Sequence, residues 1–393
     1  MGENNKKKYL SGEHSMIKIL FLIHDLGQGG AEKVLVNLVN NMDYSKFDVT
    51  VMTLFDTGEN RQFLNPNVKY KTWCRKMFPG NSHLMKLLTP QQLHKLIIRE
   101  RYDIEIGYLE GPCARVISGC VDSSVKKVAW IHIEQHTAKK ASSSFRSIYE
   151  AKQCYQKFDR IVCVSESVKN DFMRALNIQA KYAVLYNTNE SEKIIQLSKE
   201  NIDSETIKTE NNVVKLVGVG KLLKNKGFDR LVKTVKRLKD EGYKLHLYIL
   251  GDGPEYNNLQ NYIKKNKLDL YVTLLGYQLN PYKYLAKSDL FVCASLQEGF
   301  STAATEALIL GIPVCTVSVS GMREMLGDNE FGVIVENNEQ ALYLGIKRFL
   351  DEPKLLNYYK KQAIKRGETF KTDQTVSAVE DFLFKLYKGD SDD

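Results

Sequence analysis

Apolar residues gather in short runs of strand length, and each run is followed by a longer stretch with helical spacing. In the first half of the chain these runs lie at 17–23, 47–54, 102–109, 127–133, 160–164 and 182–185. They are largely continuous rather than alternating, which is typical of parallel strands covered by helices on both faces. The order of strands and helices therefore predicts a doubly wound α/β sheet.

The pattern stops once and then restarts. The stretch 189–212 is polar and charged and has no apolar run, so we place a linker between two domains there. Further runs of strand length lie at 213–219, 244–250, 271–275, 289–294, 313–317 and 331–335. The sequence predicts two doubly wound domains, 16–188 and 213–372, which face each other across a cleft where the carboxyl ends of the strands gather ligands.

Both ends of the chain depart from this pattern. Residues 1–15 are polar and contain lysines but no apolar middle, so they do not resemble a secretory signal, and we expect a disordered leader. The region 373–393 predicts a C-terminal helix, a candidate to pack back on the N-terminal domain, followed by an acidic tail.

Composition narrows the class of protein. The formal charge of +9 favours anionic partners such as phosphate-bearing ligands or an acidic membrane surface, although a solvated basic surface explains most of the lysines. Basic and aromatic residues are not clustered as nucleic-acid binding requires. The seven cysteines are scattered, most of them inside apolar runs, which indicates buried free thiols in a reducing compartment. No charge-free apolar run approaches the ~20 residues that cross a bilayer, so we expect a cytoplasmic protein.

The segment 288–313 carries the most chemistry. A strand leads to a turn at Glu298-Gly299, then to Ser301 or Thr302 as a helix cap, and then to a short helix. The amide groups from Phe300 onward would lie at the start of that helix, where they attract phosphate. Within this segment Glu298 and Glu306 fit two interpretations, charges favoured by the helix dipole or acceptors for the paired hydroxyls of a sugar or ribose.

A second strand, turn and helix lies at 217–231. Gly220 begins its turn, and Lys221 and Lys226 bracket it, which suits the neutralisation of a departing diphosphate. A solvated basic loop is the alternative, and we assign Lys224 to that role. Lysine binds phosphate as a point charge without the fork of arginine.

Together the two segments resemble glycosyltransferase family 4, retaining enzymes with the GT-B fold. The family marker is E-x7-E in an E-G-F context, followed by E-A-x-x-x-G-x-P-V. The chain matches the first part with Glu298-Gly-Phe-Ser-Thr-Ala-Ala-Thr-Glu306 and the second with E-A-L-I-L-G-I-P-V at 306–314. The run G-M-R-E follows at 321–324. The family motif G-R-L-x-x-x-K-G is similar to 220–227, where Lys221 replaces the usual arginine. That change keeps the charge and loses the bidentate geometry.

The first domain extends the resemblance. The segment 24–34 looks like the family's G-G-A-E loop, in which Gly29 and Gly30 permit close backbone approach to the donor phosphates. His132 ends a strand at the position where the family has a histidine near the reacting sugar, although a structural histidine is the alternative. His136 follows at a metal-like interval, but no third ligand follows it, so we expect no metal there. A structural or acceptor-facing role is left for His136.

The resemblance implies a role for each candidate. Glu306 would bind the ribose hydroxyls, and Lys221 and Lys226 the diphosphate. Glu298 would bind the sugar, together with the backbone around Gly299 and with Phe300, Ser301 and Thr302. We name Glu298, His132, Lys226 and Lys221 as the catalytic candidates and expect no metal or other cofactor.

The implied activity is that of a retaining hexosyltransferase. It would move a hexose or N-acetylhexosamine from a nucleotide-diphosphate sugar, by default a UDP-sugar, to a glycan acceptor. The acceptor would be linked to a polyprenyl diphosphate carrier, in capsule, exopolysaccharide or lipopolysaccharide synthesis. A nucleotide-sugar epimerase or dehydrogenase is an alternative with doubly wound domains, but the spacing after Gly27 does not give the dinucleotide fingerprint. The second alternative is a non-catalytic partner subunit of a transferase, but such a subunit would lose the charged residues that are present here.

The segment 84–101 carries apolar and basic residues at helical spacing. Such a face can rest on an anionic bilayer, here the inner face of the plasma membrane. The alternative, which we favour, is a core-facing helix interrupted near Pro90.

Overall fold

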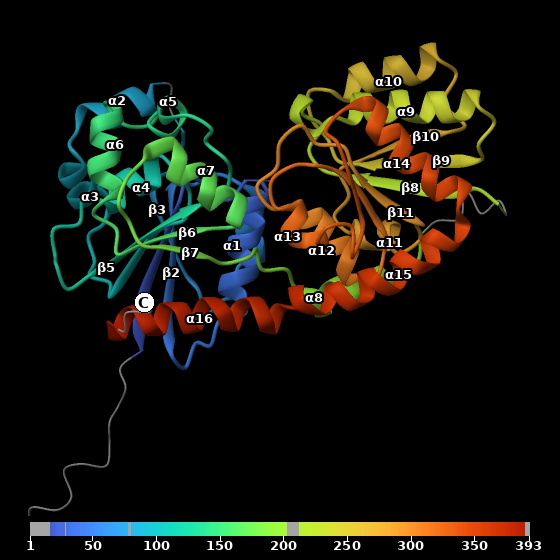
Figure 1. Ribbon diagram of the computed structural model, residues 1–393. Helices are drawn as coiled ribbons and strands as arrows, with labels where there is room; N and C mark the ends of the chain where they lie inside the picture. The colour runs from blue at the N-terminus through green and yellow to red at the C-terminus, as the bar shows by residue number, and fades with distance from the viewer. Residues whose placement is uncertain (1–15, 28, 78–79, 203–211, 390–393) are drawn as a thin grey trace, which may run out of the picture.

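The computed structural model describes residues 16–27, 29–77, 80–202 and 212–389. The predicted leader, the 203–211 part of the predicted linker and the end of the acidic tail at 390–393 lie outside the described residues. Within the described residues the chain forms two α/β domains side by side (Figure 1).

The N-terminal domain is built on a seven-stranded sheet in the order β3-β2-β1-β4-β5-β6-β7, and all its neighbouring strands are parallel. Its strands are β1 (Ile17–Ile23), β2 (Phe47–Phe55), β3 (Lys69–Cys74), β4 (Ile104–Gly107), β5 (Lys126–Ile131), β6 (Arg160–Cys163) and β7 (Tyr182–Val184). The order reverses between β1 and β4, so the helices that follow the two halves of the sheet cover opposite faces.

The C-terminal domain repeats this plan with a six-stranded parallel sheet in the order β10-β9-β8-β11-β12-β13. Its strands are β8 (Val214–Val219), β9 (Leu245–Leu250), β10 (Val272–Gly276), β11 (Leu290–Cys293), β12 (Val314–Val317) and β13 (Val333–Val335). Each coincides with one of the apolar runs in the second half of the sequence. The predicted fold class, two doubly wound domains, is confirmed.

Helices connect successive strands in both domains. In the N-terminal domain they are α1 (Gly30–Asn40), α2 (Asn81–Leu87), α3 (Pro90–Ile97), α4 (Pro112–Ile117), α5 (Ala138–Ala141), α6 (Ile148–Tyr155) and α7 (Glu166–Leu176). The second half of the chain adds α8 (Ser191–Ser198), α9 (Phe228–Asp240), α10 (Tyr256–Lys265), α11 (Tyr282–Leu285), α12 (Thr302–Ile309), α13 (Met322–Leu326), α14 (Glu339–Asp351), α15 (Pro353–Gly367) and α16 (Thr372–Lys388).

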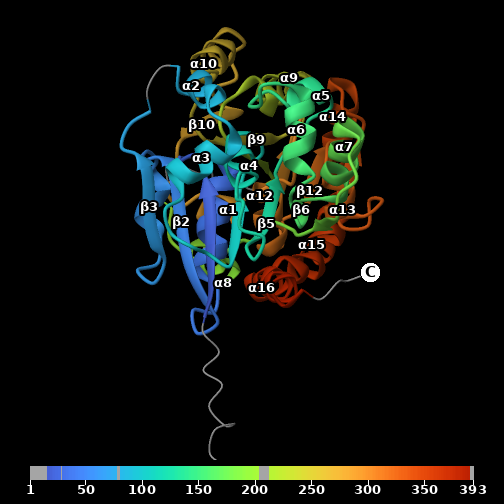
Figure 2. The ribbon, with the colours of Figure 1, turned by 90° about the vertical axis from the view of Figure 1, so that its left-hand side faces the viewer.

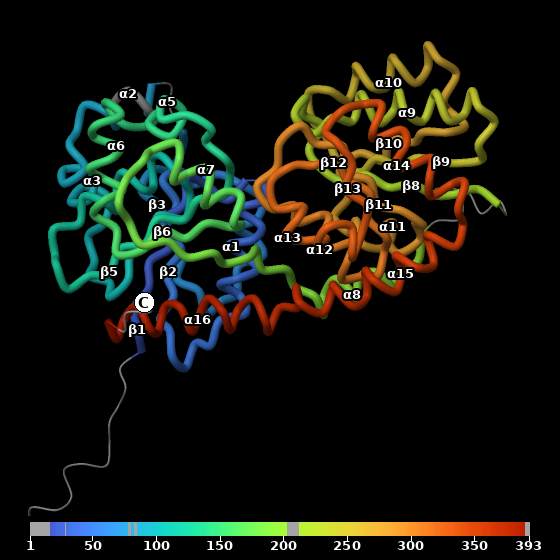
Figure 3. The backbone as a smooth tube through the Cα atoms, in the orientation of Figure 1, coloured from blue at the N-terminus to red at the C-terminus, as the bar shows by residue number. Residues whose placement is uncertain are grey.

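The chain passes between the domains twice, after β7 and again between α15 and α16 (Figure 3). The two passages are joined, because the Ser191 amide donates a hydrogen bond to Thr372 Oγ1 (2.8 Å) and the Thr372 hydroxyl donates one to the Asn189 carbonyl (2.9 Å). Beyond this point α16 lies along the N-terminal domain (Figure 2), where Glu380 accepts a hydrogen bond of 2.6 Å from the Asp43 amide. The last helix therefore fastens one domain to the other.

Two segments differ in detail from the sequence pattern. The predicted linker begins with helix α8, which buries Ile194 and contacts α11 and α12. The segment 84–101 forms two helices, because Thr89 caps α3 through a capping box with Gln92 and Pro90 occupies the first turn. The apolar face of α3 is buried at Leu93, so this helix is core-facing.

Candidate functional site

A cavity of about 630 Å³ lies between the two domains. It opens where the segments after β1 and β5 meet those after β8 and β11. The strand order of each sheet reverses beside β1 and β8, and ligands of open α/β sheets bind at such points. The residues predicted to form the site all line this cavity: Gly29, Gly30, His132, Gly220, Lys221, Lys226, Glu298, Gly299, Phe300, Ser301, Thr302 and Glu306.

The segment after β11 forms the turn and helix start expected from its sequence. Ser301 is the cap of α12 and accepts a hydrogen bond of 3.3 Å from the Ala304 amide, whereas Thr302 is the first helical residue. The amides of Thr302 and Ala303 have no acceptor within the helix, and both residues line the cavity. The positive end of the α12 dipole is therefore available to an anion.

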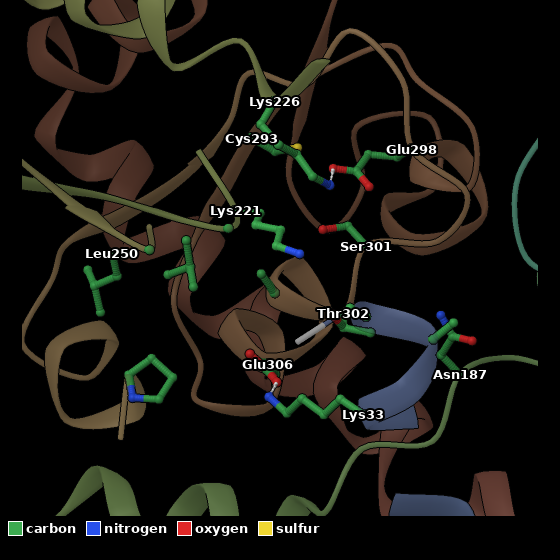
Figure 4. Close-up of a pocket in the computed structure, with 18 of the residues that line it drawn as sticks. Lys33, Asn187, Lys221, Lys226, Leu250, Cys293, Glu298, Ser301, Thr302 and Glu306 are labelled. Carbon is green, nitrogen blue, oxygen red and sulfur yellow. Dashed lines mark hydrogen bonds and ion pairs between the residues drawn. The ribbon is translucent and has the colours of Figure 1, made fainter. Parts of the chain in front are cut away.

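Glu298 and Lys226 are paired with each other. Lys226 Nζ lies 2.6 Å from Glu298 Oε1 (Figure 4). The Ser295 hydroxyl donates to the same oxygen over 2.6 Å. The loops after β8 and β11 thus meet through opposite charges. A ligand that uses both residues must bind beside this pair or separate it.

Lys221 points its amine into the middle of the cavity (Figure 4), and within the described ranges it has no ion-pair partner. Lys224 is exposed and does not line the cavity, as expected for a solvated loop residue. Of the two lysines predicted to bind the diphosphate, Lys226 is therefore engaged with a carboxylate of its own domain, and Lys221 is turned towards the open space.

Lys33, which sequence reasoning did not select, reaches the cavity from α1. Its Nζ lies 2.5 Å from Glu306 Oε1 and 2.9 Å from the Tyr282 hydroxyl. Burial opposes the charge of Lys33, but attraction to Glu306 outweighs it and raises the pKa of Lys33. Burial and the same carboxylate raise the pKa of Tyr282 to about 12. The only signal in the sequence was the position of Lys33 directly after the G-G-A-E loop.

His132 is buried, and its ring packs against that of Tyr108 with centroids 4.8 Å apart. Burial lowers the pKa of His132 to about 3, so the ring is neutral at physiological pH. Its Nε2 atom is buried without a hydrogen-bond partner among the described residues. A buried nitrogen without a partner is uncommon in folded proteins, and His132 is one of the residues that line the cavity.

His136 lies in the same loop as His132, between β5 and α5. Its Nδ1 is 3.2 Å from Asp171 Oδ1 and its Nε2 is 3.2 Å from Gln297 Nε2, beside a second hollow of about 430 Å³. His136 does not line the main cavity, so the two histidines do not form one site.

The domains touch closely around the cavity. A Cβ atom added to Gly299 would lie 1.9 Å from the His132 carbonyl oxygen, so only glycine permits this approach. Asn187 donates to the Phe300 carbonyl over 3.1 Å. The Glu324 carboxylate accepts the Glu166 and Ser167 amides at the start of α7, at 2.8 and 3.0 Å. The two domains thus line one cavity and are hydrogen-bonded to each other.

Comparison with known proteins identifies the family. Residues 28–189 match the family model described as Glycosyltransferase Family 4, and residues 198–366 match the model described as Glycosyl transferases group 1. Over 371 residues the chain is 30% identical to N-acetylgalactosamine-N,N'-diacetylbacillosaminyl-diphospho-undecaprenol 4-alpha-N-acetylgalactosaminyltransferase of Campylobacter jejuni, an alignment that covers 90% of this chain and 96% of that protein. The chain belongs to glycosyltransferase family 4.

Solved structures agree on the fold of this family 4 enzyme. HepE from Anabaena in complex with UDP and glucose superposes with a TM-score of 0.72 at 17% identity, over 94% of this chain and 99% of that one. Sucrose-phosphate synthase from Thermosynechococcus elongatus gives a TM-score of 0.76 at 15% identity, over 95% and 100% of the two chains. The predicted family, the GT-B fold and the hexosyltransferase class are confirmed, and the epimerase and partner-subunit alternatives lose their basis.

Proposed function

We propose that this family 4 glycosyltransferase uses a nucleotide-diphosphate sugar, by preference a UDP-sugar, and transfers a hexose or N-acetylhexosamine with retention of the anomeric configuration. The acceptor in this proposal is a glycan on a polyprenyl diphosphate, in capsule, exopolysaccharide or lipopolysaccharide synthesis. The observation that carries the proposal is the single cavity that holds both acidic residues of the E-x7-E motif together with Lys221 and Lys226.

The proposed donor lies along the wall of the C-terminal domain. Glu306 takes the ribose hydroxyls, and Lys221, Lys226 and the amides at the start of α12 take the diphosphate. Glu298 and the backbone around Gly299 take the sugar. The HepE structure was solved with UDP and glucose, which supports a uridine nucleotide as the first donor to test.

In the proposed reaction the acceptor hydroxyl attacks the anomeric carbon from the face on which the diphosphate departs. The bond from the anomeric carbon to the diphosphate oxygen breaks, the glycosidic bond forms, and the hydroxyl proton passes to the departing phosphate. Lys221 and Lys226 stabilise the charge that develops on this phosphate. Side chains and helix amides supply this stabilisation, and we propose that no metal cofactor takes part.

His132 has a supporting role in this proposal. His132 lines the same cavity from the N-terminal domain, and its Nε2 is buried without a partner among the described residues. A hydrogen bond from or to a hydroxyl of the transferred sugar would satisfy that nitrogen. The histidine would then hold the sugar in place rather than carry charge, since burial keeps its pKa at about 3.

The relative from Campylobacter jejuni is named for a diphospho-undecaprenol acceptor, which supports a lipid-linked acceptor here. Among the described residues, every helix is too short or too polar to span a bilayer. We propose that the enzyme works in the cytoplasm, at the inner face of the plasma membrane, and reaches its acceptor from the membrane surface.

One surface of the N-terminal domain suits such contact. Leu87 is 75% exposed at the end of α2 and Tyr149 is 71% exposed on α6. Arg146 fixes these elements side by side by donating to the Lys86 and Leu87 carbonyls, over 2.7 and 2.8 Å. Apolar side chains beside basic ones favour an anionic membrane. Flotation with anionic liposomes tests this surface; a Leu87→Ser/Tyr149→Ser variant that floats as well as the unchanged enzyme would contradict it.

A thermal-shift screen over nucleotide-diphosphate sugars tests the donor. We expect stabilisation by one class of donor, followed by transfer of its sugar to a polyprenyl-diphosphate glycan and an NMR spectrum of the product with the anomeric configuration of the donor. Inversion of that configuration would contradict the retaining mechanism, and no stabilisation by any nucleotide-diphosphate sugar would contradict the donor class.

A further inference from the structure

Lys33 forms an ion pair that crosses the cleft. It lies on α1 of the N-terminal domain, and its partner Glu306 lies on α12 of the C-terminal domain, 2.5 Å away (Figure 4). Tyr282 of α11 closes a triangle, since its hydroxyl lies 2.9 Å from Lys33 Nζ and 3.3 Å from Glu306 Oε1.

Glu306 depends on this lysine for charge compensation. Only 2% of Glu306 is exposed, and a carboxylate removed from water to that degree requires a cation or several hydrogen-bond donors. The lysines of its own domain do not provide the cation, because Lys226 is paired with Glu298 and Lys221 makes no ion pair within the described ranges. The cation that compensates Glu306 therefore comes from the opposite domain.

The two carboxylate oxygens of Glu306 are used unequally. Oε1 accepts from both Lys33 and Tyr282, whereas no side-chain hydrogen bond reaches Oε2 from the residues that the structure describes. Because Glu306 lines the cavity, one oxygen is held by protein and the other is left for a ligand. An ionised carboxylate oxygen accepts hydrogen bonds from neighbouring hydroxyl groups.

We infer that Lys33 is a positioning residue for the ribose of the donor. It fixes Oε1 of Glu306, so that Oε2 is left to accept the ribose hydroxyls. This inference rests on the proposed function, in which Glu306 binds ribose. Because Lys33 belongs to the N-terminal domain, the ribose site is complete only while the domains are closed, and donor affinity is coupled to closure.

The test compares two ligands that differ only at the ribose. UDP and 2′,3′-dideoxyuridine 5′-diphosphate are titrated calorimetrically into the unchanged enzyme, Lys33→Met and Lys33→Arg. We expect Lys33→Met to weaken UDP binding about tenfold, which corresponds to the loss of one charged hydrogen-bonding arrangement. Binding of the dideoxy ligand stays unchanged, because it lacks the hydroxyls that Glu306 would bind. Lys33→Arg keeps the charge and restores part of the UDP affinity.

Lys236→Met is a matched control. Lys236 has the same side-chain exposure as Lys33, 37%, and pairs with Asp240 over 2.6 Å, but its partner is on the same helix and away from the cavity. We expect this variant to bind both ligands as the unchanged enzyme does. With a sugar donor, Lys33→Met should raise the donor KM more than it lowers kcat.

Two results would overturn the inference about Lys33 and leave the proposed function standing. One is that Lys33→Met binds both ligands equally more weakly, which indicates action on the phosphates or the fold. The other is that Lys33→Met binds UDP as tightly as the unchanged enzyme. An unchanged enzyme that binds no UDP would instead contradict the uridine donor of the proposed function, and the ribose inference with it.

Discussion

Lys226 Nζ and Glu298 Oε1 lie 2.6 Å apart, so this ion pair joins the basic turn after β8 to the acidic turn after β11. Both side chains are mostly buried, at 26% and 12% exposure. Each residue compensates the other, and the pair stands beside the start of α12. Loss of one member leaves a poorly solvated charge at the position that we propose for the sugar diphosphate.

We therefore expect Lys226→Ala and Glu298→Ala each to lower kcat by at least about a hundredfold, the size found when a group that stabilises developing charge is removed. Donor consumption is the measurement. Lys224→Ala, in the same turn but outside the cavity, is the control and should keep its activity. Near-normal rates for either cavity variant would show that the site lies elsewhere.

Lys221 stands where the family pattern has arginine. Its amine points into the cavity, and we expect Lys221→Ala to slow turnover about tenfold or more through loss of a charge near the leaving phosphate. Lys221→Arg restores the family residue and should keep kcat within about threefold. The charge is preserved, and the guanidinium group of arginine can donate two hydrogen bonds to one phosphate. If Lys221→Ala has full activity, Lys221 does not hold the diphosphate.

Gly299 lies directly against the backbone of the opposite domain. A methyl group there would lie 1.9 Å from the His132 carbonyl oxygen, so Gly299→Ala must push the two loops apart. A displacement of this kind at a catalytic site costs about a hundredfold in rate, and we expect kcat/KM to fall by that order. Circular dichroism serves as a check that the variant is folded. A folded Gly299→Ala enzyme with normal kcat/KM would show that this close approach is not needed for turnover.

We expect a buried pair away from the cavity to contribute to stability, and this contribution to depend on pH. His94 Nε2 lies 2.7 Å from Glu105 Oε2, and Cys120 joins them. Burial lowers the pKa of His94, but hydrogen bonds from its partners outweigh burial and raise it from 6.5 to about 9. A raised pKa in the folded state stabilises the protein fully below pH 6.5 and loses this contribution as the pH rises through about 9.

The melting temperature should therefore fall between these pH values, and it should fall less in a His94→Gln/Glu105→Gln variant. The measurement includes a chelator, because all three groups are of metal-binding type. An identical pH dependence in both proteins would show that the pair does not contribute.

Site residues that lie close together in the sequence could be predicted from it, whereas contacts between distant residues could not. Glu298, Ser301 and Glu306 belong to one strand, turn and helix, so their shared position near a helix start could be read from spacing alone. Lys33 could not be connected to Glu306 in this way, because the pair is formed by packing of two domains. The free Nε2 of His132 likewise depends on the burial that the fold imposes.

In the fold, too, buried elements could be predicted from the sequence and elements at the edge or surface could not. Buried parallel strands have continuous apolar runs, whereas the edge strand β3 (Lys69–Cys74) alternates basic and other residues and gave no such run. Helix α8 escaped notice inside a polar stretch because only one face, at Ser191 and Ile194, is buried against the rest of the protein. Both elements depend on neighbours that are distant in sequence.

A crystal structure of the enzyme with UDP would show where the donor nucleotide binds. We expect the diphosphate between Lys221 and the start of α12, within hydrogen-bond distance of Lys221 or Lys226, and the ribose hydroxyls on Glu306. UDP bound in another part of the molecule, or in this cavity with its ribose away from Glu306, would contradict this expectation.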